Sequence, residues 1–144
     1  MFKFGRSSRL NLMGVHPDLV LVMSRALLYS THDFKITEGL RDIERQRYLV
    51  ETGKSHTMNS MHLLQADGYG HAVDVMPVGD LDGDGDVDAH DKKITWTRPF
   101  FEAINVAVQR AAGELGVQVL WGGVWRKHFG GKGDCPHFQL TEGP

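Results

Sequence analysis

The chain has 144 residues, with 16 Lys and Arg against 18 Asp and Glu, so its formal net charge is −2 with histidine neutral. This length fits one ordinary domain. A content of 41% hydrophobic and 24% charged residues excludes a disordered chain. The near-neutral charge argues against a dedicated nucleic-acid binder, whose domain is usually strongly basic. Cys135 is the only cysteine, so no intrachain disulfide stabilises the fold.

The amino-terminal segment and the most apolar stretch bear on targeting. Lys3, Arg6 and Arg9 are not followed by an apolar run, and polar side chains interrupt residues 19–28. A membrane span needs about 20 apolar residues, and a signal peptide needs a hydrophobic region before a small-residue cleavage site. We therefore expect no signal peptide and no membrane span, and synthesis in the cytoplasm.

The amino-terminal half predicts two helices and a strand. Residues 17–30 carry apolar side chains at helical spacing, and Pro17 suits the first position of a helix. Residues 34–37 predict a short strand. A second helix is expected over residues 43–52, with Asp42 as its amino-terminal cap.

The carboxy-terminal half predicts one long helix and three strands. Apolar residues recur at steps of three and four from Phe101 to Leu115, and Gly116 ends this helix. Strands are expected over 72–76, where Pro77 ends the run, and over 117–120 and 137–140. Since helices and strands do not alternate regularly, we expect an α+β fold in which helices pack on one face of a small, mostly antiparallel sheet.

Metal-capable side chains concentrate at His62, at residues 71–74 and at residues 134–137. A catalytic zinc site needs three nitrogen or oxygen ligands and an open position, and a nearby carboxylate can take a proton from the attacking water. In a strand, Asp74 points to the face opposite His71, so both cannot be ligands of one ion. Eight histidines also produce such groups by chance, so ordinary polar residues remain the alternative.

A strongly acidic segment lies at about residues 79–92 and matches the EF-hand calcium loop. Asp80, Asp82, Asp84, Asp88 and Asp91 occupy positions 1, 3, 5, 9 and 12, and Asp86 at position 7 would offer its backbone carbonyl. Gly85 stands at position 6, where the loop turns sharply. We expect a calcium loop inserted in the domain, with modest affinity because Asp91 replaces the usual Glu. A solvated acidic loop without an ion is the alternative.

The acidic segment also changes how the net charge is interpreted. It contains six of the 18 acidic residues and no Lys or Arg, so 16 basic residues face 12 acidic ones elsewhere, a formal +4. A mildly basic body of this kind suits an anionic cell envelope.

The combination of motifs resembles a known family. Ser60-x-His62, Gly70-x-Ala72-x-Asp74 and Asp134-x-x-His137 together resemble the zinc peptidases of the D-Ala-D-Ala carboxypeptidase and L-alanyl-D-glutamate peptidase group. Further segments are similar to phage endolysins of the L-alanyl-D-glutamate type: Phe2-Lys3-Phe4-Gly5, Val15-His16-Pro17-x-Leu19, Glu38-Gly39-Leu40-Arg41 with Gln46, Gly53-Lys54-Ser55, and Trp121-Gly122-Gly123-x-Trp125. The resemblance covers nearly the whole chain and implies a single zinc peptidase domain over 1–144 with a hedgehog/D-Ala-D-Ala peptidase-like fold.

The resemblance also implies roles for six residues. They are His62, Asp74 and His137 as zinc ligands, Asp134 as general base, Arg41 at the oxyanion or the substrate, and Ser60 at the substrate. For Arg41, a structural salt bridge is the alternative. Trp121 and Trp125 suit either a substrate groove or the core.

Two departures from the family pattern matter. Residues 63–69 make the spacing after His62 about five residues longer than the usual H-x-x-G, which leaves His71 as an alternative ligand. Val124 stands where the family commonly has an acid.

We therefore expect a zinc-dependent endolysin that hydrolyses the L-Ala–D-Glu bond of the peptidoglycan stem peptide. A D-Ala-D-Ala carboxypeptidase with the same metal chemistry is the close alternative. A non-catalytic calcium-binding or wall-binding module is an alternative of another class. The resemblance implies action on the bacterial cell wall after release by a holin-like partner, and we expect a monomer.

Overall fold

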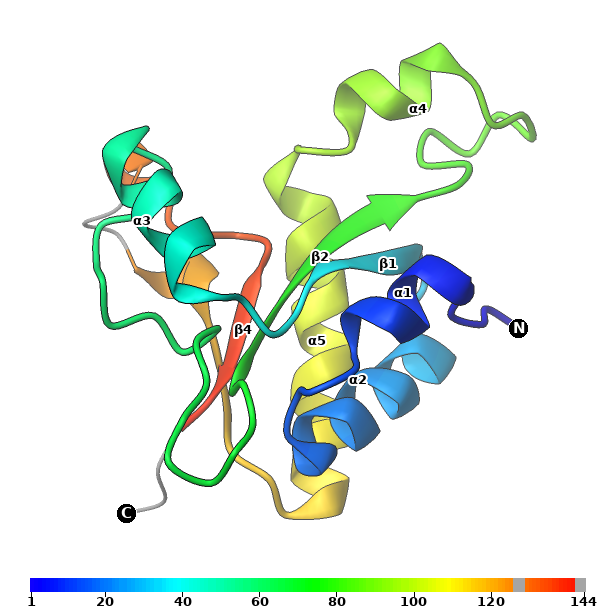
Figure 1. The fold of residues 1–144 in the computed structure, drawn as a ribbon. Helices are drawn as coiled ribbons and strands as arrows, with labels where there is room; N and C mark the ends of the chain where they lie inside the picture. The colour runs from blue at the N-terminus through cyan, green and yellow to red at the C-terminus, as the bar shows by residue number, and fades with distance from the viewer. Residues whose placement is uncertain (126–128, 142–144) are drawn as a thin grey trace.

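The computed structural model describes residues 1–125 and 129–141 and shows helices around a four-stranded sheet (Figure 1). In chain order, the elements are α1 (Arg6–Asn11), α2 (Pro17–Tyr29), β1 (Asp33–Glu38), α3 (Ile43–Glu51), β2 (Ala72–Val78), α4 (Ala89–Ile94), α5 (Arg98–Leu115), β3 (Val119–Trp121) and β4 (His137–Leu140). Two short 3₁₀ turns, η1 (Gly122–Val124) and η2 (Phe129–Gly131), lie between β3 and β4.

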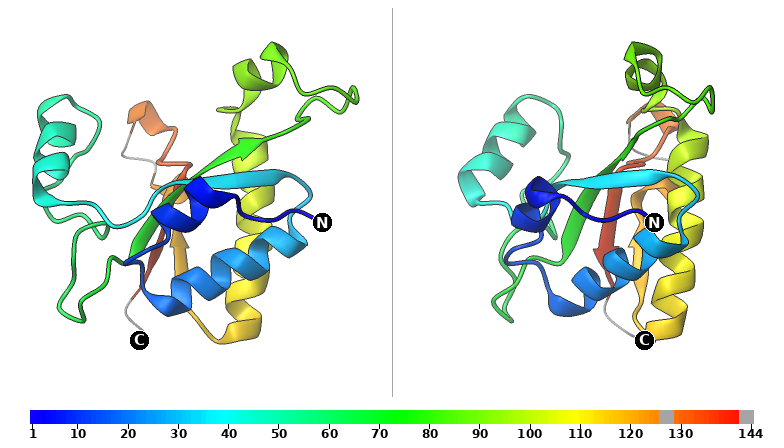
Figure 2. Two further views of the ribbon diagram at one scale, coloured as in Figure 1. Left: turned by 45° about the vertical axis from the view of Figure 1, so that its right-hand side comes forward. Right: turned by 90° about the vertical axis from the view of Figure 1, so that its right-hand side faces the viewer.

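The strand order is β1-β2-β4-β3, and every neighbouring pair is antiparallel. Helices α2 and α5 cover one face of the sheet, while α3 stands on the opposite side (Figure 2). The expected α+β fold with an antiparallel sheet is thus confirmed. Among the described helices, none is both long and apolar enough for a membrane crossing.

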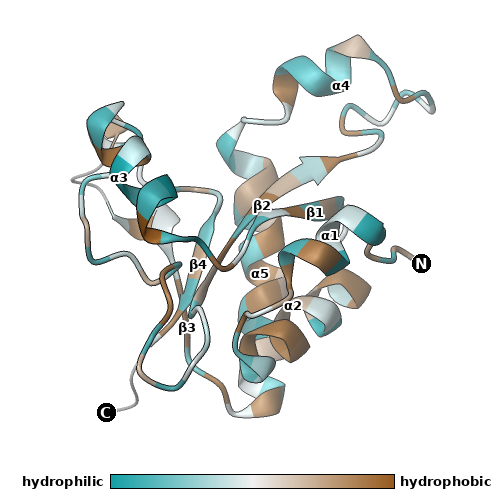
Figure 3. Ribbon diagram, viewed as in Figure 1, coloured by the Kyte–Doolittle hydropathy of each residue, from teal (hydrophilic) through white to brown (hydrophobic). Residues whose placement is uncertain are grey.

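The core lies between the sheet and the pair α2 and α5, where hydrophobic residues concentrate (Figure 3). Both helices bury the face that their apolar spacing predicts. The largest completely buried core side chains include Phe34, Phe101, Phe138, Leu19 and Met23. This packing leaves the other face of the sheet available for polar side chains.

The expectation that Pro77 ends its strand is wrong, because β2 continues to Val78. The Pro77 carbonyl accepts a hydrogen bond from the Thr95 hydroxyl at 2.6 Å, so it points away from β1. In an antiparallel strand, the nitrogen of a residue points to the same side as its carbonyl. The pairing with β4 ends at Asp74. The missing N–H of Pro77 therefore falls on a side without a strand partner, where proline is tolerated.

Candidate metal centre

Three side chains from separate parts of the chain meet on the sheet face opposite α2 and α5. His62 comes from the loop between α3 and β2, Asp74 from β2 and His137 from β4. The His62 Nε2 atom lies 3.2 Å from Asp74 Oδ1 and 3.2 Å from His137 Nδ1. The third side of this triangle, from His137 Nδ1 to Asp74 Oδ1, measures 3.3 Å.

The triangle has the dimensions of a zinc site. Tetrahedral zinc with bonds of about 2.0–2.1 Å places neighbouring ligand atoms about 3.3 Å apart. Two imidazole nitrogens and one carboxylate oxygen form a typical catalytic donor set, which leaves a fourth position open. His62, Asp74 and His137 therefore fit a single zinc ion.

The remaining nitrogen of each imidazole is held by a neighbouring oxygen. His62 Nδ1 lies 2.8 Å from the Gly39 carbonyl, and His137 Nε2 lies 2.8 Å from Gln139 Oε1. Because these oxygens accept hydrogen bonds, the outer nitrogens carry the protons. The inner nitrogens then turn their lone pairs to the same point, as in metal-binding histidines.

Burial and charge oppose each other within this cluster. Burial raises the pKa of Asp74, but the adjacent imidazoles of His62 and His137 outweigh it and hold that pKa far below its ordinary value. Burial lowers the pKa of His137, but the hydrogen bond and charge of Asp74, with a smaller contribution from Asp134, raise it overall. Without a metal, the ionised Asp74 therefore favours a proton, and with it a positive charge, on the neighbouring imidazole of His137.

The structure brings His62, and not His71, to Asp74 and His137. His71 Nε2 is instead 2.7 Å from an Asp67 oxygen, as the strand alternation before Asp74 predicts. The extra residues after His62 form a loop. Gly70, at the end of this loop, forms isolated β-bridges with Val15 and with Leu64.

Asp134 lies in the turn immediately before β4, and its side chain lines the same pocket as the triangle. Its backbone N–H donates to the Gly122 carbonyl at 2.8 Å. The two segments approach so closely that a Cβ atom on Gly122 would lie 2.5 Å from the Asp134 carbonyl oxygen. A glycine at position 122 therefore lets the loop after β3 place Asp134 beside His137.

The family model of the phage L-alanyl-D-glutamate peptidases matches residues 1–141. The chain belongs to this family. It is 31% identical over 127 residues to the L-alanyl-D-glutamate peptidase of Escherichia phage T5, over 86% of this chain and 82% of that protein. The crystal structure of the Serratia marcescens L-Ala D-Glu endopeptidase ChiX is similar with a TM-score of 0.73 and 41% identity, over 96% of this chain and 90% of that one. The resemblance expected from the motifs is confirmed.

Arg41, one of the residues that this family suggests, is buried in a polar network. Its Nε and Nη2 atoms donate to the two Glu38 oxygens, each at 2.8 Å, and Nη1 donates to Gln46 Oε1 at 2.7 Å. Nη2 also lies 3.6 Å from Asp74 Oδ2. Burial alone would raise the pKa of the Glu38 carboxyl, but the hydrogen bonds and the charge of the Arg41 guanidinium lower it overall. Both Glu38 and Gln46 stand in the family motif, but no sequence pattern gives either of them a role.

The triangle opens into a pocket of about 700 Å³ between α3, the 52–62 loop and the loop before β4. Ser60 lines it, and its Oγ accepts a hydrogen bond from the His62 N–H at 3.1 Å. Trp125 also lines it, with its ring 5.1 Å from that of His137. Trp121 is instead buried, and its indole N–H donates to the Cys135 carbonyl. Of the two tryptophans in the family motif, Trp125 thus lines the pocket and Trp121 packs in the core.

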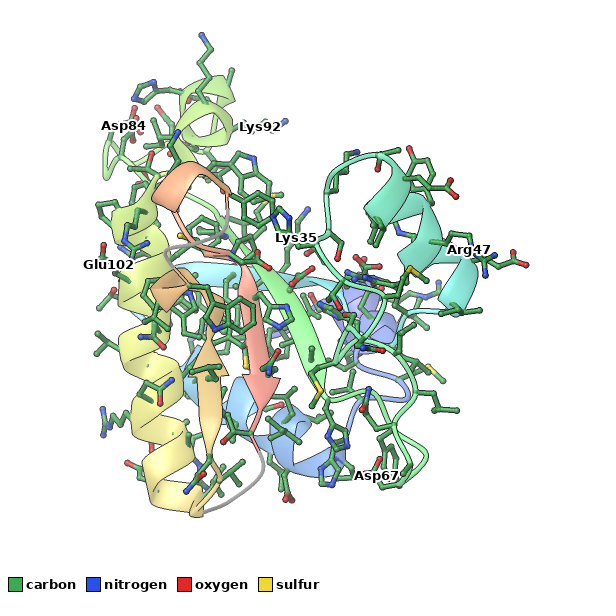
Figure 4. All side chains as sticks on the ribbon, turned by 90° about the vertical axis from the view of Figure 1, so that its left-hand side faces the viewer. Lys35, Arg47, Asp67, Asp84, Lys92 and Glu102 are labelled. Atoms are coloured by element: carbon green, nitrogen blue, oxygen red, sulfur yellow. The ribbon has the colours of Figure 1, made fainter. Side chains whose placement is uncertain are left out.

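The acidic segment folds as a tight loop that leads into α4. One carboxylate oxygen from each of Asp80, Asp82 and Asp84 lies within 4.8 Å of the others, whereas Asp86, Asp88 and Asp91 are outside this group. Asp88 caps α4, and the Asp91 carboxylate accepts a hydrogen bond from the Asp88 backbone N–H at 2.8 Å. In Figure 4, Asp84 lies at the end of the molecule occupied by α4, far from Asp67 in the loop that follows His62.

Proposed function

We propose that this family member is a zinc-dependent peptidoglycan endopeptidase that hydrolyses the L-Ala–D-Glu bond of the stem peptide. The observation that carries the proposal is the triangle of His62, Asp74 and His137, with Asp134 lining the same pocket. The names of the T5 and Serratia relatives support the choice of bond.

His62, Asp74 and His137 would hold the zinc. When bound, zinc acidifies the attacking water and polarises the scissile carbonyl as a Lewis acid. Asp134 takes the proton from the water as general base and then delivers it to the leaving amine of D-Glu. The Arg41 guanidinium places positive charge beside the carbonyl that becomes an oxyanion. The Ser60 hydroxyl contacts the peptide in the pocket.

Replacement of Asp134 by Asn tests this assignment. Because Asn keeps the shape of the side chain but cannot accept the proton, we expect Asp134→Asn to retain one zinc per chain and to lose about 10²–10⁴-fold in cell-wall lysis. Metal analysis and turbidity assays measure both. A variant that keeps zinc and lyses walls normally would show that Asp134 is not the base.

The bond that is cleaved is identified by mass spectrometry of digested wall peptides. New peptides that begin with the D-Glu amine support the endopeptidase, whereas released D-Ala identifies a D-Ala-D-Ala carboxypeptidase. A chain that binds no stoichiometric zinc and is unaffected by Asp134→Asn would be a non-catalytic module.

We also propose that the acidic loop binds calcium. Oxygens that share one calcium ion at about 2.3–2.6 Å lie within about 5 Å of one another, as those of Asp80, Asp82 and Asp84 do. Gly85 has a φ of 94°, which suits the sharp turn at position 6. Asp86 would add its carbonyl, and Asp88 and Asp91 would complete the EF-hand positions.

Calcium would order a segment that reaches the catalytic pocket. The loop leads through α4 to Trp96, which lines the pocket and stacks on Phe101 at 5.9 Å. We therefore expect calcium to raise the activity and thermal stability of metal-stripped enzyme that has been reconstituted with zinc. If a calcium titration changes neither, the regulatory role fails.

The proposed substrate places the site of action in the bacterial cell wall. The protein would act there as a monomer, after a holin-like partner has opened the path from the cytoplasm. Gel filtration measures the oligomeric state.

A further inference from the structure

We propose that Glu38 is a positioning residue of the metal centre. It holds Arg41 on the side of the outer oxygen of Asp74, Oδ2, and so keeps the inner oxygen, Oδ1, free for the metal. The inference rests on the proposed zinc site. It assigns a function to a carboxylate that is neither a ligand nor the proposed base.

Arg41 lies between two carboxylates, those of Glu38 and Asp74. Its guanidinium makes two 2.8 Å hydrogen bonds to Glu38 but stands 3.6 Å from Asp74 Oδ2. The Arg41 side chain is 7% exposed, so its charge cannot be satisfied by bulk water. The closer carboxylate therefore determines where this buried cation settles.

An irregularity in β1 brings Glu38 to this place. Ile36 pairs with Val75, but Glu38 pairs with Asp74, so Thr37 is an extra residue in β1. In a regular strand, Glu38 would share the buried face of Phe34 and Ile36. The bulge turns its side chain to the face of Asp74 instead, a known effect of bulges near functional sites.

The cross-strand pair of Glu38 and Asp74 needs a positive charge to balance it. Two carboxylates directly opposite each other repel, so Glu38 beside Asp74 would be unfavourable without a cation between them. Arg41 is that cation, and Gln46 fixes it from a third direction at 2.7 Å. If Glu38 lost its charge, the nearest anion for Arg41 would be Asp74. A two-pronged pair of Arg41 with Asp74 would then occupy the oxygen that faces His62 and His137.

The test compares zinc affinities by competition with a chelator, which does not depend on catalysis. We expect Glu38→Gln to weaken zinc binding about 10–100-fold, as removal of groups that orient metal ligands typically does. The double variant Glu38→Gln/Arg41→Met removes the cation that would capture Asp74, so it should recover most of that loss. If Glu38 had a merely structural role, the second substitution at Arg41 would not restore the zinc affinity.

Arg45→Gln is the matched control, because Arg45 contacts the same Glu38 oxygen from the exposed side at 3.4 Å without touching Asp74. Its zinc affinity should stay within about twofold of the wild type. Circular dichroism of the zinc-free variants verifies that each is folded. If folded Glu38→Gln binds zinc like the wild type, or if the double variant binds as weakly as the single one, the proposal is overturned. If the wild type binds no zinc, the proposed function itself fails.

Discussion

Asp74 on β2 and His137 on β4 are directly opposite each other in the antiparallel ladder, with 3.3 Å between Oδ1 and Nδ1. Two of the three proposed ligands are therefore positioned by one strand register. A slip of a single residue would turn one of the two to the core face and separate them. Phe138, completely buried between them and the helices, opposes such a slip.

The pH dependence of zinc binding follows from this pair. Because the pKa of His137 is raised, the metal-free site keeps a proton above the ordinary value of 6.5, and zinc must displace it. The pKa of Asp74 is lowered, so this carboxylate stays ionised throughout the neutral range. We expect zinc affinity to rise with pH until the pH exceeds the raised pKa of His137.

The stability of the metal-free protein should change in the opposite direction. A raised histidine pKa stabilises the fold below the unfolded value and loses this contribution as the pH rises through the folded value. Thermal unfolding with and without zinc between about pH 5.5 and 8.5 measures both effects. Asp74→Asn should remove the pH dependence of the metal-free form, and a zinc affinity that is constant over this range would contradict the prediction.

Gly122→Ala tests the close approach of the two loops. A methyl group would lie 2.5 Å from the Asp134 carbonyl oxygen, so the turn that carries Asp134 must move. We expect a loss of about 1–3 kcal/mol in the free energy of unfolding and a clear loss of lysis activity. Gly113→Ala is the control, because a Cβ there meets nothing within 4 Å. In the helix α5, that change should stabilise by about 0.5–1 kcal/mol.

Much of the architecture could be predicted from the sequence, because helical spacing marks α2 and α5 and the family motifs mark the three proposed ligands. The bulge at Thr37 could not, since it depends on pairing with β2 and leaves no local signal. The expectation that Pro77 ends the strand fails for the same reason: its missing N–H matters only if a strand lies on that side.

The two candidate ligands His62 and His71 show how far a local sequence pattern can predict which side chain reaches Asp74. Strand alternation before Asp74 correctly predicts that His71 points away from it. It says nothing of His62, which reaches the triangle from a loop and is oriented by the Gly39 carbonyl. The position of His62 therefore depends on contacts between segments that are distant in the sequence, and residue spacing does not reveal such contacts.

Arg98 has no sequence signal that marks it as important for the site, but its contacts support a further prediction. Its Nη1 donates to the carbonyls of Gly123 and Lys132 at 3.1 and 3.0 Å, so it ties both sides of the loop that carries Asp134. Its guanidinium also lies 4.9 Å from the Trp121 ring centre. We expect Arg98→Ala to cost about 1–3 kcal/mol and to reduce lysis more than zinc content.

Glu102→Gln is the control for this prediction. Glu102 pairs with Arg98 Nε at 3.0 Å on the helix surface, where such a pair contributes about 0.3–0.5 kcal/mol. Chemical denaturation and lysis assays should therefore distinguish the two variants. Equal effects of both would show that the loop contacts of Arg98 are unimportant.

Asp91 provides the last prediction, because its carboxylate stabilises the acidic loop even without an ion. One oxygen accepts the N–H groups of Leu81 and Asp82 at 2.7 and 3.2 Å, and the other accepts that of Asp88 at 2.8 Å. The hydrogen bond from Asp88 is the main reason that the pKa of Asp91 is lowered, ahead of an opposing effect of burial. In calcium-free buffer, Asp91→Ala should lower the unfolding temperature and speed proteolysis within residues 79–92, since three backbone donors lose their acceptor. Asp86→Asn, an exposed change in the same loop, should alter neither measurement. If the two variants behave alike without calcium, Asp91 acts only as a ligand and not as the internal support of the loop.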